Sequence, residues 1–417
     1  MLLVLVPLSV ALSCGGEVAT TAGTPAFSLR DSAGVTIAES SDSTWTDATR
    51  WRIADEPDLV IGSVDGSVPG TDFGGYLDVV SLPQGIAVLN HQSDEIRIFD
   101  PAGRWVTTLG GRGDGPAEFR SLSAIAPVAG DSVGAWGSRA RKIVTFPLAG
   151  GSPRVLGTTD RDHAGLYDWR LSAWLSDGRY LLEARSDPRT RPQTATVDSS
   201  RLILFSPAGD SLASFGPFPL WQSLFAALEG SGETRLRRFL GSSAITRASG
   251  EMIWRGFPDH GFEVLSVDIS TGDRRIVRRP HDRVSPAEGA FEAARRLELD
   301  SYGGDSPQVL EAMQQTWDAL SPVDRMPAYR DFLVAPDGGL WVNHMADPGQ
   351  VMPEDRVSLS GYRTSNWSVF DASGRWLGTV AFPAEFELRE VGFGSALGVR
   401  SDELGVSYVE RYPILLP

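Results

Sequence analysis

The sequence has one cysteine, Cys14, and one lysine, Lys142, in 417 residues. With a single cysteine no intramolecular disulfide can form, so the fold must be held by its core and by strand pairing. All other Lys/Arg positions are arginine, and the formal net charge is −15. A surface of this charge repels a phosphate backbone over most of its area, which argues against nucleic acid as the partner.

The chain also lacks an apolar run long enough to span a bilayer. Residues 1–13, MLLVLVPLSVALS, are apolar but short, and they end in small residues as signal peptides do. The stretch around Cys14, ALSCGG, resembles the bacterial lipobox, in which the cysteine becomes the lipidated N-terminus, although Ala11 stands where that motif usually has leucine. We therefore expect a signal peptide over 1–13, lipidation at Cys14, a flexible tether over 14–26 and a folded domain over 27–417.

Glycine and proline are plentiful, with 45 and 27 residues spread along the chain, which favours many short strands joined by turns. One unit recurs: an alternating strand, a turn opened by Asp or Ser, a glycine and a second strand. Three copies align without a gap, IRIFDPAGRWV from Ile96, LILFSPAGDSL from Leu202 and WSVFDASGRWL from Trp367. Glycine supplies the positive φ that such a turn requires, so each copy predicts a β-hairpin.

Counting these hairpins predicts the architecture. Two weaker copies cover 143–156 and 264–277, and a second hairpin signal precedes each copy, within 79–89, 124–136, 171–183, 244–254 and 332–342. Five four-stranded units result, and a sixth opens at Val391 without its outer strands. The segment 27–39 repeats the hairpin pattern, and we expect it to complete the sixth unit. The sequence thus predicts an all-β fold, a six-bladed β-propeller closed by an N-terminal hairpin.

Two short motifs point to a known family. RDSAGV begins at Arg30, and LGGRGDGPAEF from Leu109 to Phe119 links the first unit to the second. The chain resembles bacterial six-bladed β-propellers related to NHL-repeat proteins, many of them lipoproteins of unassigned role. Their signature usually reads GGxGxGPGEF, so Ala117 departs from it where glycine is typical. The resemblance covers nearly the whole mature chain and implies architecture more firmly than activity.

Two insertions interrupt the repeats, at about 217–242 and, between blades four and five, at about 280–330. In the longer one SPAE at 285–288 is a capping box, followed at helical spacing by Phe291, Ala294 and Leu297. A second helix is expected from Ser306-Pro307, with a stripe of Leu310, Met313, Trp317 and Leu320. We expect this helical pair to pack on the propeller rim. The alternative is a lid or docking arm over one mouth of the channel.

Catalytic motifs are weak. Gly130-Asp131-Ser132-Val133-Gly134 matches the pattern of a nucleophile elbow, but a hairpin surrounds it where that motif needs a strand-to-helix turn. The tripeptide Arg112-Gly113-Asp114 lies in the glycine-rich turn between blades, and we interpret it as structural. No Walker loop, Cys/His pair or regular Asp-x-Asp-x-Asp loop occurs, so we predict no cofactor and no protein-built metal cage.

Histidines give the best candidate site. His91 and His344 follow equivalent strands, after Val-Leu-Asn and Trp-Val-Asn, and His260 lies near the same position of its own unit. Residues at equivalent repeat positions converge around a propeller's channel mouth although they are far apart in sequence. The candidate ligand-binding residues are His91, His163, Asp168, Trp169, Arg255, His260 and His344. The alternative is that they are ordinary polar residues of solvated loops.

These observations favour a binding protein over an enzyme. We expect an exported, lipid-anchored monomer of the cell envelope, at the outer membrane or facing the periplasm if the cell is Gram-negative, that presents propeller loops to a protein, peptide or glycan. The alternative is a metal-dependent enzyme of the lactonase or lyase type, in which a divalent ion in the channel polarises the substrate. A third interpretation is a purely structural envelope component.

Overall fold

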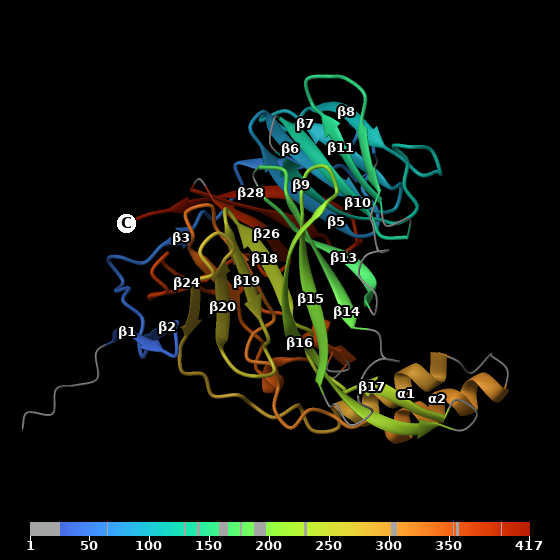
Figure 1. Ribbon diagram of the computed structural model, residues 1–417, viewed down its shortest axis with the longest axis vertical. Helices are drawn as coiled ribbons and strands as arrows, with labels where there is room; N and C mark the ends of the chain where they lie inside the picture. The colour runs from blue at the N-terminus through green and yellow to red at the C-terminus, as the bar shows by residue number, and fades with distance from the viewer. Residues whose placement is uncertain are drawn as a thin grey trace, which may run out of the picture.

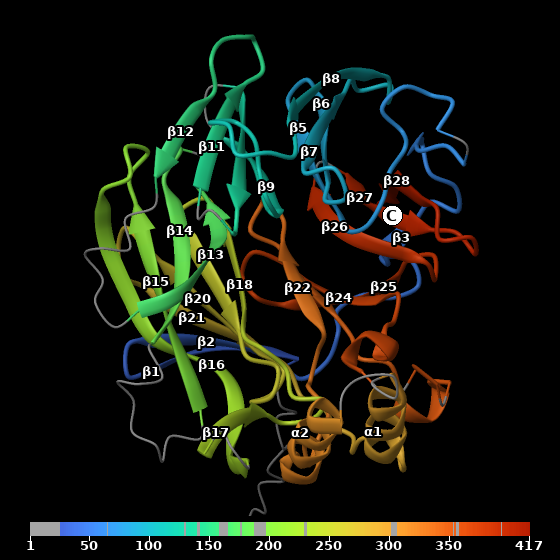
Figure 2. The same ribbon diagram turned by 90° about the vertical axis from the view of Figure 1, so that its right-hand side faces the viewer.

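The structure is a computed structural model. It describes residues 26–64, 66–128, 131–139, 142–157, 166–175, 177–186, 197–228, 232–301, 307–352, 354–355, 358–392 and 394–417. The expected signal peptide, Cys14 and all of the tether except Ala26 lie outside these residues. The described chain forms six sheets around one axis, which confirms the predicted six-bladed propeller (Figures 1 and 2).

The first three blades follow one another along the chain. Blade one is β5 (Leu77–Leu82), β6 (Gly85–Asn90), β7 (Glu95–Phe99) and β8 (Trp105–Gly110). Blade two is β9 (Leu122–Val128), β10 (Ser132–Gly137), β11 (Lys142–Pro147) and β12 (Arg154–Gly157). Blade three is β13 (Leu166–Trp174), β14 (Tyr180–Ser186), β15 (Val197–Phe205), β16 (Ser211–Leu228) and an additional strand, β17 (Gly232–Arg237).

The remaining blades repeat the pattern. Blade four contains β18 (Ile245–Ser249), β19 (Met252–Gly256), β20 (Glu263–Asp268) and β21 (Arg274–Arg278). Blade five is β22 (Asp331–Val334), β23 (Leu340–Asn343), β24 (Asn366–Phe370) and β25 (Trp376–Ala381). Blade six contains β26 (Phe386–Gly392), β27 (Ser395–Ser401) and β28 (Ser407–Leu415). Every predicted hairpin of these blades is therefore present.

The turn chemistry read from the sequence accounts for the hairpins. In blade one a carboxylate oxygen of Asp100 accepts hydrogen bonds from the backbone N–H groups of Ala102 and Arg104, both at 2.9 Å. Gly103 has φ +79°, a conformation that favours glycine because a Cβ is disfavoured there. Asp371 and Gly374 repeat this arrangement in blade five, with φ +87° at the glycine.

The six inner strands, β5, β9, β13, β18, β22 and β26, lie next to one another in a closed ring. Consecutive strands within a blade are antiparallel, so the fourth strand of each blade ends on the side where the next inner strand begins. We call this side the inter-blade face. It carries the starts of the inner strands and the ends of the second strands, whereas the tight turns described above lie on the opposite side.

Closure of the ring corrects one prediction. The strand β28 pairs with β4 (Leu59–Ile61) and with β3 (Arg52–Ile53), so an N-terminal segment does complete blade six. We expected the hairpin at 27–39 to be that segment, and this expectation is wrong. The hairpin forms β1 (Phe27–Ser32) and β2 (Val35–Ser40), and β2 pairs in parallel with β21 on the outer edge of blade four. The expectation failed because the hairpin's sequence specifies its own turn and not the edge that it joins.

The chain from the hairpin to β4 passes the outside of three consecutive blades. Ser40 Oγ accepts a hydrogen bond from the backbone N–H of Trp376 at 2.9 Å, and the Trp45 N–H donates to the Leu377 carbonyl at 2.7 Å, both in blade five. Trp45 then packs against Trp51, whose ring lies near that of Trp341. We call residues 27–61 the N-terminal belt, because they join the outer edges of blades four, five and six.

Two helices, α1 (Ala290–Ser301) and α2 (Pro307–Ala319), lie between β21 and β22. They lie between blades four and five, as predicted. When the blade of β26, β27 and β28 is counted as the first, the same two blades are the fifth and sixth. The helix α1 begins at Ala290 and not at the predicted capping box, because Gly289 has φ +74°, which is incompatible with a helix. No helix among the described residues is long and apolar enough to cross a membrane.

The apolar stripe of the helices packs mainly against the extension of blade three. Phe239, just after β17, contacts Phe291 of α1 and Trp317 of α2, with ring centroids 5.4 and 5.9 Å apart. Leu297 does not join this packing, since it is 61% exposed. The helices and the β16–β17 hairpin form one projection, on the far side of the ring from blade one (Figure 1).

Ile61 tests the closure of the ring. It is 2% exposed and packs with strands of blades one and six, whereas Val60 beside it is 50% exposed. We expect Ile61→Ala to lower the free energy of unfolding by about 2–5 kcal/mol, because it removes buried apolar contacts and leaves a cavity. Val60→Ala, the control, should change it by no more than about 0.5 kcal/mol. Denaturant unfolding measures both, and equal effects would contradict closure through β4.

Candidate functional site

His91 and His344 occupy the positions that the repeat predicts. Each follows the second strand of its blade, β6 or β23, on the inter-blade face. His91 Nδ1 lies 2.8 Å from the Leu122 carbonyl oxygen and therefore carries a proton, since only an N–H can bond to a carbonyl. His344 Nε2 lies 2.8 Å from the Ser368 hydroxyl. Both rings are half-buried and held in place.

A cavity adjoins each of these histidines. The His91 cavity has a volume of about 340 Å³ and is lined by His91, Asp94, Arg112, Arg120, Ser121 and Arg139. The His344 cavity has a volume of about 500 Å³, and its walls include His344, Asp347, Met352, Asp355, Arg363 and Asn366. The short 3₁₀ segments Pro348–Gln350 and Leu359–Tyr362 frame the second cavity. Neither lining is apolar enough to suggest a purely hydrophobic ligand.

The other predicted residues lie elsewhere. Trp169 is buried inside blade three, beside Phe205, and does not lie on a surface loop. His260 is exposed and its ring contacts Phe257 at 4.2 Å between centroids. Asp168 belongs to β13, but its side chain lies outside the description, as does the whole of His163. The five of these seven residues whose side chains are described therefore do not meet in one place.

Arg255 is part of a buried ion pair between blades. Its Nη1 lies 2.8 Å from a carboxylate oxygen of Glu183 in blade three, and both side chains are almost completely buried. Its Nη2 donates to Ser200 Oγ and to the Pro219 carbonyl, each at 2.8 Å. Burial lowers the pKa of Arg255, while Glu183 opposes the shift. This pair joins blades three and four. Removing either partner would leave an uncompensated buried charge.

The sequence interpretation missed a group of charged side chains near the starts of four inner strands. Asp78 comes from β5, Arg247 from β18, Asp331 from β22 and Arg389 from β26, and Tyr76 precedes β5. Arg247 Nη2 binds both oxygens of Asp331, at 2.9 and 3.0 Å. The guanidinium of Arg389 lies over the Tyr76 ring, 5.0 Å from its centroid. We call these five residues the central cluster.

The central cluster is only partly buried, since Tyr76 is 48% exposed and the side chains of Arg247 and Asp331 are each 37% exposed. Burial raises the pKa of Asp78, and Arg389 and the Val79 N–H act against that shift. Burial also raises the pKa of Tyr76, with the nearby Asp78 carboxylate adding to it. Yet Asp78 keeps some accessible surface. Groups that are desolvated but still reachable are suited to binding polar ligands, because hydrogen bonds are stronger where water is scarce.

Contacts join the His344 cavity to the His91 cavity across blades five, six and one. Arg363, in the wall of the His344 cavity, pairs with Glu387. Glu387 also accepts a hydrogen bond from Arg389 at 2.7 Å, and Arg389 lies over Tyr76. The Tyr76 carbonyl in turn accepts a hydrogen bond from the backbone N–H of His91 at 3.1 Å. We call this surface, from Arg363 to His91, the polar track.

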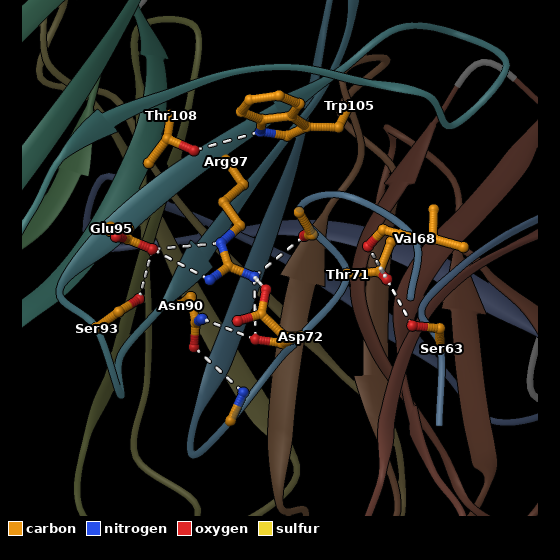
Figure 3. Close-up of polar contacts among 12 residues, drawn as sticks. Ser63, Val68, Thr71, Asp72, Asn90, Ser93, Glu95, Arg97, Trp105 and Thr108 are labelled. Atoms are coloured by element: carbon orange, nitrogen blue, oxygen red, sulfur yellow. Dashed lines mark hydrogen bonds and ion pairs between the residues drawn. The ribbon is translucent and has the colours of Figure 1, made fainter. Parts of the chain in front are cut away.

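A buried arginine in blade one holds the connection that leads to Tyr76. Arg97, whose side chain is 7% exposed, reaches between Glu95 and Asp72 in Figure 3, with nitrogen–oxygen distances of 3.1 and 2.7 Å. Its Nη1 also donates to the carbonyls of Gly70 and Asp72, at 3.1 and 3.0 Å. These bonds fix the connection from β4 to β5, at whose end Tyr76 lies. The closing segment of the ring therefore supplies part of the site.

The described residues contain no group of three or more His, Cys, Asp and Glu side chains arranged to hold a metal ion. The acidic and basic groups of the polar track alternate and pair with one another. What this arrangement offers chemically is a series of oriented hydrogen-bond donors and acceptors.

No family model matches the sequence, and no curated protein matches it either. Solved structures do match. A member of the DUF4221 family from Bacteroides vulgatus has a TM-score of 0.50 at 9% identity, over 89% of this chain and 100% of that one. A protein named as exported from Bacteroides fragilis gives 0.47 at 11%, over 92% and 100%, and a gluconolactonase from Xanthomonas campestris gives 0.38 at 11%, over 89% and 99%. At these identities the likeness shows the fold alone.

His344 predicts a pH dependence of stability. Burial lowers its pKa to about 4, and the neighbouring Arg279 and His281 shift it in the same direction. Because this value is below the ordinary 6.5, the unfolded chain binds the proton more readily. The stability contributed by neutral His344 is therefore complete above pH 6.5 and is lost as the pH falls towards 4.

Between pH 7 and pH 4 we expect the free energy of unfolding to fall in the wild type and in His344→Gln. The fall should be smaller in His344→Gln by roughly 2 kcal/mol. Denaturant unfolding at several pH values measures the difference. His260→Gln, which replaces an exposed histidine, is the control and should follow the wild type. A His344→Gln profile parallel to the wild type would show that His344 is not held neutral.

Proposed function

We propose that this chain is an exported, lipid-anchored binding protein of the cell envelope, which holds an extended polar ligand along the polar track. The observation that carries the proposal is the continuity of the track, from Arg363 through Glu387, Arg389 and Tyr76 to His91. It spans three blades and has a cavity at each end. A peptide, a protein segment or a glycan chain has the shape that such a surface accommodates.

The chemistry of the track supports binding by hydrogen bonds and charge. Its donors and acceptors are preorganised by pairs that already fix their orientation, so a ligand loses little free energy in ordering them. The ligand would exchange hydrogen bonds with water for hydrogen bonds with the track, which gives specificity through geometry more than through buried apolar area. The net charge of −15 argues against a polyanion as the whole ligand.

The envelope location is proposed from the sequence before the propeller. The apolar residues 1–13 and the lipobox-like ALSCGG support export and lipidation at Cys14. The described propeller begins with the hairpin at Phe27, which pairs with the outer edge of blade four and not with a strand of the polar track.

Arg363→Ala tests the track. The Arg363 side chain is 56% exposed, so its loss should leave the fold intact, while removing a charged donor should weaken ligand affinity about tenfold or more. Arg104→Ala is the matched control, because Arg104 is also exposed and paired with a carboxylate but lies at a tight turn on the opposite side. The measurement is the amount of peptide or glycan that the immobilised chain retains from an envelope extract, identified by mass spectrometry.

The wild type and Arg104→Ala should retain the same ligand and Arg363→Ala should lose most of it. Equal retention by all three proteins would contradict a role for the track. A stoichiometric divalent metal in the purified chain, with turnover of a lactone, would contradict a role limited to binding.

Cys14→Ser tests the anchor. We expect the wild-type chain to fractionate with membranes and to incorporate labelled fatty acid, because acylation supplies the only apolar attachment that the sequence suggests. The Cys14→Ser variant should lose the fatty-acid label. Label retained by this variant would contradict lipidation at Cys14.

A further inference from the structure

The His91 cavity gathers three arginines in a strongly acidic protein. Arg112 and Arg120 come from the connection between β8 and β9, and Arg139 follows β10, so the cavity lies between blades one and two. The lining contains one carboxylate, that of Asp94. A second carboxylate, Asp114, pairs with Arg120, so the three guanidinium groups exceed the two carboxylates by one positive charge, which is opposite in sign to the net charge of the chain.

The frame of this cavity is rigid. Asp94 has a side chain that is almost fully buried, and one of its oxygens accepts hydrogen bonds from the N–H groups of Ser121 and Leu122, at 3.1 and 2.8 Å. Its other oxygen lies 3.1 Å from Nε of Arg112. Asp94 thus serves as a structural support that orients Arg112. It is not a free acid available to repel an anion.

Donors remain free on the arginines. A guanidinium has five N–H donors. Arg112 directs Nε to Asp94 and Nη2 to the Gln92 carbonyl, at 2.6 Å, and Arg120 directs Nε and Nη2 to Asp114. Within the described part of the chain, no hydrogen bond occupies Nη1 of either guanidinium. No hydrogen bond or ion pair joins Arg139, which is exposed, to another residue of the described chain.

We propose that the His91 cavity binds an anionic group, a carboxylate or a phosphate, at one end of the ligand. This inference rests on the proposed function in placing that group on a longer ligand, but the cavity's affinity for small anions stands by itself. Guanidinium groups match the planar edges of carboxylate and phosphate with paired N–H donors. Ser121 and the ring of His91, whose Nδ1 is already committed to Leu122, supply the remaining polar wall.

The test uses inorganic phosphate and malonate as probes. Each is titrated into the purified chain by calorimetry, with sodium chloride adjusted so that ionic strength stays constant. We expect saturable binding of at least one probe, and Arg139→Gln should weaken it about tenfold, since one charged donor is lost. Arg296→Gln is the matched control, because Arg296 is an exposed arginine of α1, across the ring from the cavity.

The outcomes separate the alternatives. Preference for phosphate indicates a phosphate ester in the ligand, and preference for malonate indicates a carboxylate. Absence of saturable binding, an Arg139→Gln affinity equal to the wild type, or equal weakening by Arg296→Gln would overturn the proposal. Circular dichroism and thermal unfolding of each variant check that the fold is kept. The titrations use no envelope ligand, so their outcome is independent of the Arg363→Ala test. Either test can succeed while the other fails.

Discussion

The pairing of β28 with β4 is the contact on which the rest of the structure depends. Six blades around an axis are held as a closed ring when the two ends of the propeller chain meet in one blade, as β28 meets β4 and β3 here. This pairing also places part of the site. The residues after β4 form a connection that is held by Arg97 and ends at Tyr76. The same strand pairing therefore closes the ring and assembles the polar track.

Arginine side chains make many of the hydrogen bonds and ion pairs described above. Buried guanidinium groups at Arg97 and Arg255 each bind carboxylates and backbone carbonyls at once, and both join segments that are far apart in the sequence. On the inter-blade face the same chemistry is used with partners that leave donors free. The planar, permanently charged guanidinium suits both roles, since it can satisfy several acceptors without losing its charge.

The blades could be predicted from the sequence because a hairpin is specified locally: Asp100 and Gly103 determine their turn with little help from the rest of the chain. The closing strands could not, because β3 and β4 are short and owe their place to a partner strand about 350 residues away. His91 and His344 were found through the repeat. The central cluster was missed because Asp78, Arg247, Asp331 and Arg389 lie on four different blades, and only the closed ring brings them together.

The distance along the chain between the closing partners has a consequence for folding. Arg411 on β28 binds Asp58 beside β4, 353 positions earlier, with nitrogen–oxygen distances of 2.8 and 3.2 Å. Loop closure over such a span is slow and cannot occur until β28 has been synthesised. The nascent polypeptide therefore remains an open row of hairpins until β28 emerges, and during this interval it is vulnerable to aggregation.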